Sequence, residues 1–159
     1  MKKFLALLLS LSVLFVMAGC SAEKPIQTAT YVMETEDFAC SITDTQTVTA
    51  SGDIVTELDE TTVIDLRQTD EATKAALIAN YDQIFGTMQD GAPETVTIET
   101  SCVDNIYTVS ILINVKDSNL QELINGGYLT AGDENTANIK FLSFEKTCNL
   151  LASSGYTLQ

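Results

Sequence analysis

Histidine and tryptophan are absent from this 159-residue sequence, and basic residues are few. Without histidine, the chain lacks the commonest general base near neutral pH and the commonest metal ligand, which excludes Ser-His-Asp and Cys-His catalysis. Only 8 lysines and arginines stand against 22 aspartates and glutamates, for a net charge of −14. Because such a surface repels phosphate groups, the composition argues against a nucleic-acid-binding protein.

The chain also lacks an apolar run of about 20 residues, the length that a permanent membrane-spanning helix needs. Its long apolar run covers residues 4–17, without a charge, and follows the basic pair Lys2 and Lys3. This shorter length is typical of the apolar core of a signal peptide. The run ends in Met17-Ala18-Gly19-Cys20, which resembles the lipobox of bacterial lipoproteins.

The lipobox has a chemical mechanism. The small residues Ala18 and Gly19 let a peptidase approach the backbone, and the Cys20 thiol takes a diacylglyceryl group as a thioether. Cleavage before Cys20 frees an amine that a fatty acid such as palmitate can acylate, and two or more acyl chains hold a protein stably on a membrane. The alternative interpretation is an ordinary secretory signal that happens to meet a cysteine.

This pattern predicts the domain organisation. We expect residues 1–19 to be a lipoprotein signal peptide, residues 20–29 a lipidated polar tether, and residues 30–159 a single domain. Lipidation at Cys20 would place that domain on the extracytoplasmic side of the cell membrane. The lipid anchor would attach it to that membrane.

The first half of the domain has the alternation of strands. Residues 31–37, 38–43 and 54–66 each fit a strand, and residues 50–53 form a turn signal. Thr69-Asp70-Glu71 then opens a helix, which we expect Gly86 to end. Apolar residues at helical spacing predict the core-facing stripe of this helix: Leu77, Tyr81, Ile84, Phe85 and Met88.

The second half mixes strands and helices. Residues 95–102 and 106–115 read as a hairpin closed by Asp104-Asn105, and Ser118 with Gln121 forms a capping box before a short helix that stops at residues 125–127. A brief strand over 137–142 and a last helix, capped by Ser143 and ended by Gly155, complete the chain. We therefore predict an α+β fold: a mainly antiparallel sheet of about five strands with two to three helices packed on it.

The chain resembles the YehR family of small bacterial lipoproteins. The resemblance rests on the Tyr81-x-x-Ile84-x-Gly86 pattern, on the two strands and short capped helix that follow, on the final Gly155-Tyr156 and on the lipobox. It implies a sheet with packed helices. It implies no enzymatic activity, no cofactor and no functional residue except the lipidated Cys20.

Three further cysteines, Cys40, Cys102 and Cys148, fall on predicted inward faces. An extracytoplasmic location permits disulfides, and Cys40–Cys102 is the most plausible of the three single pairings. The alternative, which we favour, is three small core residues with free thiols. No CxxC spacing or histidine completes a zinc site.

Other candidate sites have simpler structural interpretations. Ser143 and Lys146 have the Ser-x-x-Lys spacing of penicillin-recognising enzymes, but Ser143 also serves as a helix cap. Asp133-Glu134-Asn135 begins like a calcium loop without its glycine. The acidic run of residues 57–60 fits a solvated face. We therefore predict no catalytic, cofactor or metal residues, with weak divalent-cation binding as an alternative.

Two classes of function remain. The first is a non-catalytic envelope lipoprotein that binds an envelope protein or a small ligand. The second is a small membrane-held enzyme that uses carboxylates. A pair of carboxylates with raised pKa in an apolar cleft would favour the enzyme, whereas a solvated acidic surface would favour the binding protein.

Overall fold

The structure is a computed structural model that describes residues 24–37, 40–129 and 139–159. The predicted signal peptide, the predicted lipidation site Cys20 and the Asp133-Glu134-Asn135 segment lie outside these described residues.

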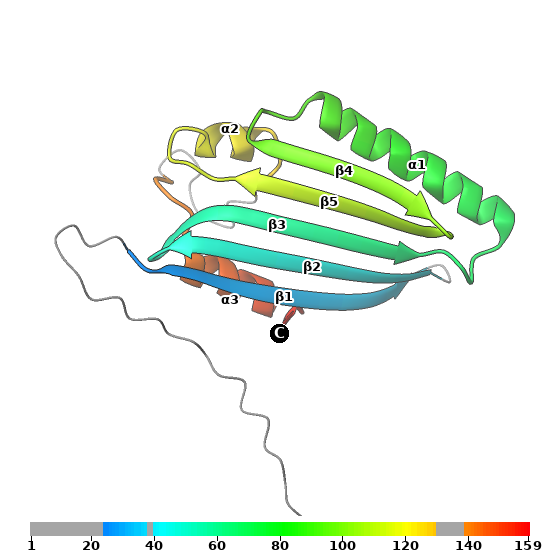
Figure 1. The fold of residues 1–159 in the computed structure, drawn as a ribbon, viewed down its shortest axis with the longest axis horizontal. Coiled ribbons are helices and arrows are strands. Elements are labelled where there is room, and N and C mark those ends of the chain that lie inside the picture. The colour runs from blue at the N-terminus through cyan, green and yellow to red at the C-terminus, as the bar shows by residue number, and fades with distance from the viewer. Residues whose placement is uncertain (1–23, 38–39, 130–138) are drawn as a thin grey trace, which may run out of the picture.

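One antiparallel sheet of six strands organises the described part of the chain (Figure 1). Its strand order is β4-β5-β3-β2-β1-β6, and every neighbouring pair is antiparallel. The strands are β1 (Ile26–Asp37), β2 (Cys40–Ser51), β3 (Ile54–Asp65), β4 (Val96–Val103), β5 (Ile106–Asn114) and β6 (Thr157–Leu158).

Two tight turns close the hairpins where the sequence predicts them. Gly52 and Asp53 join β2 to β3, and Gly52 has a φ of +60°, a backbone conformation that favours glycine. Asp104 and Asn105 join β4 to β5 with φ values of 52° and 63°. Positive φ at both central residues is the geometry of a type I′ turn, whose twist matches that of the flanking strands.

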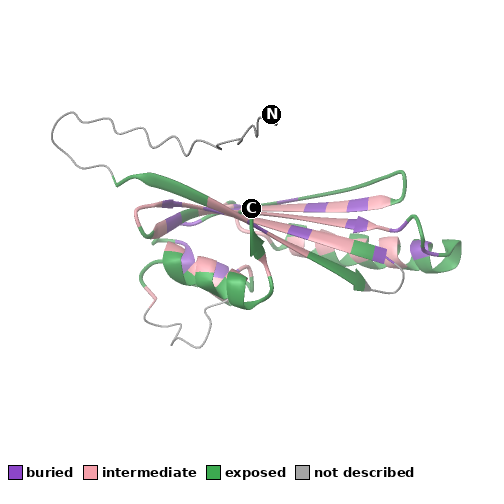
Figure 2. Ribbon diagram, turned by 90° about the horizontal axis from the view of Figure 1, so that it is seen from below, coloured by how far each residue is buried: buried purple, intermediate pink, exposed green. Residues whose placement is uncertain are grey.

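The helices of the described residues pack on one face of the sheet and leave the other face open (Figure 2). They are α1 (Glu71–Asp90), α2 (Leu120–Asn125) and α3 (Phe144–Ser153). Asp70 caps α1 by accepting from the backbone of Ala72 and Thr73, as the sequence predicts. The predicted α+β class, an antiparallel sheet with helices packed on it, is therefore confirmed.

Several predicted boundaries are wrong. The strand β1 begins at Ile26, so residues 26–29, assigned to the tether, pair with β2. Residues 139–142 form no strand, whereas a sixth strand follows α3 at Thr157 and pairs with β1. Both strand segments are fixed by long-range pairing, that of β1 with β2 and that of β6 with β1. A local sequence pattern does not show such pairing.

Two helix signals also differ from the prediction. Gly86 lies inside α1, which continues to Asp90 and ends at Gly91. A single glycine costs a helix only about 1 kcal/mol, so the packing of the surrounding turns outweighs it. The predicted capping box at Ser118 does not form, because α2 begins after Asn119. The Asn119 side chain instead accepts from the backbone of Lys116 and donates to the backbone of Asn114.

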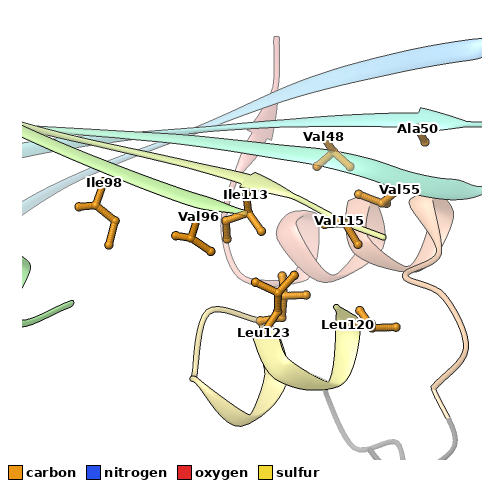
Figure 3. Packing of buried hydrophobic residues seen from close by; sticks show 10 residues of the cluster. Val48, Ala50, Val55, Val96, Ile98, Ile113, Val115, Leu120 and Leu123 are labelled. Carbon is orange, nitrogen blue, oxygen red and sulfur yellow. The ribbon is translucent and has the colours of Figure 1, made fainter. Parts of the chain in front are cut away.

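The covered face holds two clusters of buried hydrophobic residues, and Figure 3 shows the one that packs against α2. One lies under α2 and α3 and contains Val48, Val55, Val96, Ile113 and Leu123, among others. The second lies under α1 and contains Cys40, Ile64, Leu66, Tyr107 and Val109. Phe85 and Ile111 contact both cores.

The predicted stripe of α1 packs on this second core except at Ile84 and at Met88, which packs against the first core. Leu77, Tyr81 and Phe85 contact the second core, as predicted, but Ile84 is 44% exposed and Ile78 takes its place. The ring of Tyr81 lies 5.3 Å from that of Tyr107, between ring centroids.

Candidate functional site: a polar band between two cores

Along β2 and β3, a band of polar side chains lies between the two cores on the covered face of the sheet. Along β2, Cys40 and Ile42 pack in the core under α1, whereas Val48 packs in the other core. Asp44 and Gln46 share the face of these residues, because side chains alternate along a strand, and they lie between the cores. The helix-side face of β2 is therefore apolar at both ends and polar in the middle.

The neighbouring strand β3 repeats the arrangement. Ile64 belongs to the core under α1 and Leu58 packs against the other, with Thr62 and Glu60 between them. The register places Asp44 opposite Thr62 and Gln46 opposite Glu60. We call these four residues, Asp44, Gln46, Glu60 and Thr62, the polar band.

A tyrosine from the C-terminal segment completes the polar band. Gly155, with a φ of +99°, follows α3, and Tyr156 lies between this glycine and β6. The Tyr156 hydroxyl donates a short hydrogen bond to one oxygen of Asp44. Thr62 Oγ1 donates to the other oxygen at 3.2 Å. Asp44 is only 9% exposed, and these two hydroxyl groups replace the water it has lost.

Glu60 is the unusual acid of the polar band. Burial raises the pKa of its carboxyl, and the charge of Asp44 raises this pKa further, whereas the hydrogen bond from Gln46 opposes the shift. The pKa of Tyr156 is raised as well, first by burial and then by its hydrogen bond to Asp44. The polar band thus places Glu60, whose carboxyl has a raised pKa, near the hydrogen-bonded carboxylate of Asp44 in a partly desolvated environment.

Sequence reasoning missed this site by treating residues 57–60 as one solvated cluster. The structure divides them: Asp59 is exposed on the open face, whereas Glu60 faces the helices beside Leu58. The signal was present in the period of two, because Leu58, Glu60, Thr62 and Ile64 share one parity.

The Cys40–Cys102 disulfide, which the sequence left open beside the favoured interpretation of three core residues with free thiols, does not form. Cys40 lies on β2 and Cys102 on β4, and the strands β3 and β5 lie between them. Three strand spacings separate the two residues by about 14 Å, far beyond the span of a disulfide. Cys40 is buried as expected, but Cys102 is exposed, since it lies near the hairpin tip. Cys148 is half-buried, and none of the three forms a disulfide.

Ser143 is a structural cap, as the sequence predicts. Its hydroxyl accepts from the backbone N–H of Lys146 at 3.3 Å, and donates to the carboxylate of Asp53 at 2.8 Å. Asp53 also accepts from the backbone N–H of Glu145 at 3.0 Å, and this bond, followed by that from Ser143, lowers the pKa of Asp53. The serine and the aspartate therefore fasten the start of α3 to the β2–β3 turn.

The uncovered side of the sheet, which we call the open face, is rich in hydroxyl groups and acids. Along β2 it presents Ser41, Thr43, Thr45, Thr47, Thr49 and Ser51. Cross-strand hydroxyl pairs continue this pattern, such as Thr30 and Thr47, whose oxygens lie 3.1 Å apart. Glu34, Asp59 and Glu99 are exposed on the same face.

Within the described ranges, no group of three or more acids and cysteines is placed to hold a metal ion. A search of the same ranges finds no helix with the length and apolar character needed to cross a bilayer.

Comparison with known proteins gives a fold. No protein-family model and no curated protein matches the chain. An NMR structure of a protein from Streptococcus pneumoniae TIGR4 is 15% identical, with 99% of this chain and 96% of that chain covered and a TM-score of 0.50. The NMR structure of the E. coli YehR protein is 16% identical, with 87% and 93% covered and a TM-score of 0.52. At these identities the likeness concerns architecture alone, and the chain has a YehR-like fold.

Proposed function

We propose that the protein is a lipid-anchored, non-catalytic binding domain on the extracytoplasmic side of a bacterial cell membrane. The observation that carries the proposal is the order of Lys2-Lys3, an uncharged apolar run and Met17-Ala18-Gly19-Cys20. The fold is consistent with it, because β1 begins at Ile26, six positions after Cys20, so a folded domain follows the anchor at once.

The distribution of acids supports binding rather than catalysis. Glu34, Asp59 and Glu99 are exposed on the open face, where water solvates them, and the sequence has no histidine to act with them. The partner that we propose is an envelope protein or a small ligand, and the excess of acids makes nucleic acid unsuitable.

Membrane fractionation of the full-length protein in a bacterial host tests the anchor. We expect the wild-type protein in the membrane fraction, released by detergent and not by high salt. Cys20→Ala should leave that fraction or accumulate with its signal peptide uncleaved. The matched control is Cys102→Ala, which removes an exposed thiol of the folded domain and should stay membrane-bound. Membrane retention of Cys20→Ala as a processed protein would contradict the proposal.

The second candidate function, a membrane-held enzyme that uses carboxylates, is favoured by one observation. The carboxyl of Glu60 has a raised pKa. Glu60 lies on β3 opposite Gln46, two positions along the strand from Thr62, which is the partner of Asp44. Such a pair of carboxyl groups suits general acid–base chemistry.

Complementation of a deletion strain separates the two functions. If the polar band is catalytic, Glu60→Gln should abolish complementation while the amount of protein in the membrane stays unchanged. If the protein only binds, Glu60→Gln should complement as well as the control Asp59→Asn, which neutralises the neighbouring acid on the open face.

A further inference from the structure

One end of the domain brings together the start of β1, the β2–β3 turn, the end of β5 and the start of α3 (Figure 1). Ile26 pairs with Ser51 beside the turn, and Asn114 pairs with Glu57 near the start of β3. Ser143 forms a bridge with Ile54. We call this the tether end, and its outer residues are Lys24, Ile26, Lys116, Lys140, Phe141 and Lys146.

The chain is fastened to the tether end from Lys24 onward. The backbone N–H of Gly52 donates to the carbonyl of Pro25 at 2.8 Å, and Gln27 Nε2 donates to the carbonyl of Gly52 at 2.5 Å. Ser51 Oγ donates to the carbonyl of Lys24 at 3.4 Å. The stem of Lys24 lies over Gly52 so closely that an added Cβ would be 2.9 Å from Lys24 Cδ.

This attachment limits how far the domain can stand from a lipid anchor. Only residues 21–23 separate Cys20 from Lys24, and four fully extended residue steps span about 14 Å. If Cys20 carries the acyl chains, the tether end therefore lies within that distance of the acylated cysteine. The hairpin tip at Asp104-Asn105 lies at the opposite end of β5, about 30 Å further along the strand.

Two large apolar side chains are exposed at the tether end. Ile26 is 79% exposed at the start of β1, and Phe141 is 45% exposed just before the bridge of Ser143 with Ile54. The backbone beside Phe141 is held in place, because the carbonyl of Leu142 accepts from the N–H of Val55 at 2.9 Å. Both side chains are thus carried by backbone that is bonded to the rest of the domain, Ile26 through its pairing with Ser51 and Phe141 through the neighbouring Leu142.

Most of the few basic residues also lie at the tether end. Residues 20–159 contain six, and four of them, all exposed, lie at the tether end: Lys24, Lys116, Lys140 and Lys146. The other two, Arg67 and Lys74, are at the far end and pair with Asp65 and Glu71. Asp53 in the β2–β3 turn, Asp117 and Glu145 also lie at or near the tether end, so its charge is mixed, while the rest of the surface is strongly acidic.

We propose that the tether end is a membrane-contacting surface, in which Ile26 and Phe141 enter the headgroup region of the bilayer and the four lysines lie at the level of the lipid phosphates. This inference rests on the proposed anchor at Cys20. Lysine stems lie along apolar surface while their ammonium groups reach phosphate, which suits a mixed apolar and basic surface. The sheet then stands on the membrane, and the hairpin tip at Asp104-Asn105 points away from it.

The absence of tryptophan makes the orientation measurable. Phe141→Trp places a single tryptophan at the tether end, and the matched control Val103→Trp places one at the far end, where Val103 is 65% exposed. The full-length variants are purified as the membrane-anchored protein and reconstituted in vesicles of phosphatidylcholine and phosphatidylglycerol. Part of the phosphatidylcholine carries bromine on its acyl chains, which quenches a tryptophan that enters the bilayer.

We expect a blue-shifted emission and quenching several times stronger for Phe141→Trp than for Val103→Trp, with Ile26→Trp behaving like Phe141→Trp. Equal quenching at the two ends, or stronger quenching at position 103, would overturn the orientation. Co-flotation with the vesicles tests the lipid anchor separately from the orientation of the domain. Protein that floats without selective quenching overturns this inference alone, whereas protein that does not float overturns the anchor itself. Circular dichroism confirms that each variant is folded.

Discussion

The hydroxyl of Tyr156 donates a hydrogen bond to the carboxylate of Asp44, which lies 112 positions earlier in the chain. The bond joins the C-terminal segment to the middle of β2, at the polar band between the two hydrophobic cores. It is therefore a contact through which the last residues of the chain stabilise the sheet.

Removal of this hydroxyl should destabilise the domain. Tyr156→Phe leaves a buried carboxylate with one donor fewer, and hydrogen bonds to charged groups contribute about 1.5–3 kcal/mol. The matched control is Tyr128→Phe, because the Tyr128 hydroxyl donates to the neutral carbonyl of Met88 at 3.0 Å and should contribute about 0.5–1.5 kcal/mol. Urea denaturation of the soluble domain measures both, and an equal or smaller loss for Tyr156→Phe would contradict the importance of the Asp44 contact.

Glu60 should make the domain less stable as the pH rises. Its pKa in the folded state is raised by burial and by Asp44, so the ionised form carries a penalty above that pKa, and the penalty vanishes below the ordinary glutamate value of 4.5. Glu60→Gln should therefore melt at a higher temperature than wild type at pH 7, with a difference that shrinks as the pH falls toward about 4. Asp59→Asn, on the exposed side of the same strand, provides the control. Thermal melts in which Glu60→Gln is the less stable protein at pH 7 would show that the charged form is favoured.

Two glycines with open space around them should respond in opposite ways to alanine. An added Cβ meets nothing within 4 Å at Gly86 or at Gly127, but Gly86 is inside α1 and Gly127 has a φ of +77°. Gly86→Ala should raise the free energy of unfolding by about 0.5–1 kcal/mol through helix propensity. Gly127→Ala should lower it by about 1–2 kcal/mol through backbone strain. Destabilisation by Gly86→Ala would indicate that the glycine is needed for packing.

Alanine substitutions along the apolar stripe of α1 should differ in their effect on the free energy of unfolding. Leu77 packs on the core under α1, so Leu77→Ala should cost about 2 kcal/mol. Ile84 is 44% exposed, and Ile84→Ala should change stability by less than about 0.5 kcal/mol. The same denaturation measurement applies. Equal costs would place both residues in the core and contradict the observed helix orientation.

Local sequence signals predict the elements that depend on neighbouring residues. The cap at Asp70, the turn at Asp104-Asn105 and the cap at Ser143 are all correct, because each is fixed by residues within a few positions. The start of β1 and the strand β6 were missed. Both are defined by pairing across the sheet, and Thr157 reaches Val32 over 125 positions.

The polar band, like β6, depends on contacts between residues far apart in the sequence. Alternation alone places Glu60 on the face of Leu58 and Ile64, but nothing in the sequence brings Tyr156 to Asp44. Cys102 shares the helix-side face of β4 with Val96 and Ile98, yet it is exposed next to the β4–β5 hairpin tip. The alternation within β4 does not show which end of the strand is buried.

Mass spectrometry of the N-terminal peptide of the mature protein, isolated from bacterial membranes, tests the proposed lipid anchor most directly. The account predicts that the peptide begins at Cys20 and carries a diacylglyceryl group on its sulfur. An unmodified N-terminus at Ser21 or beyond, or a retained Met1, would contradict it.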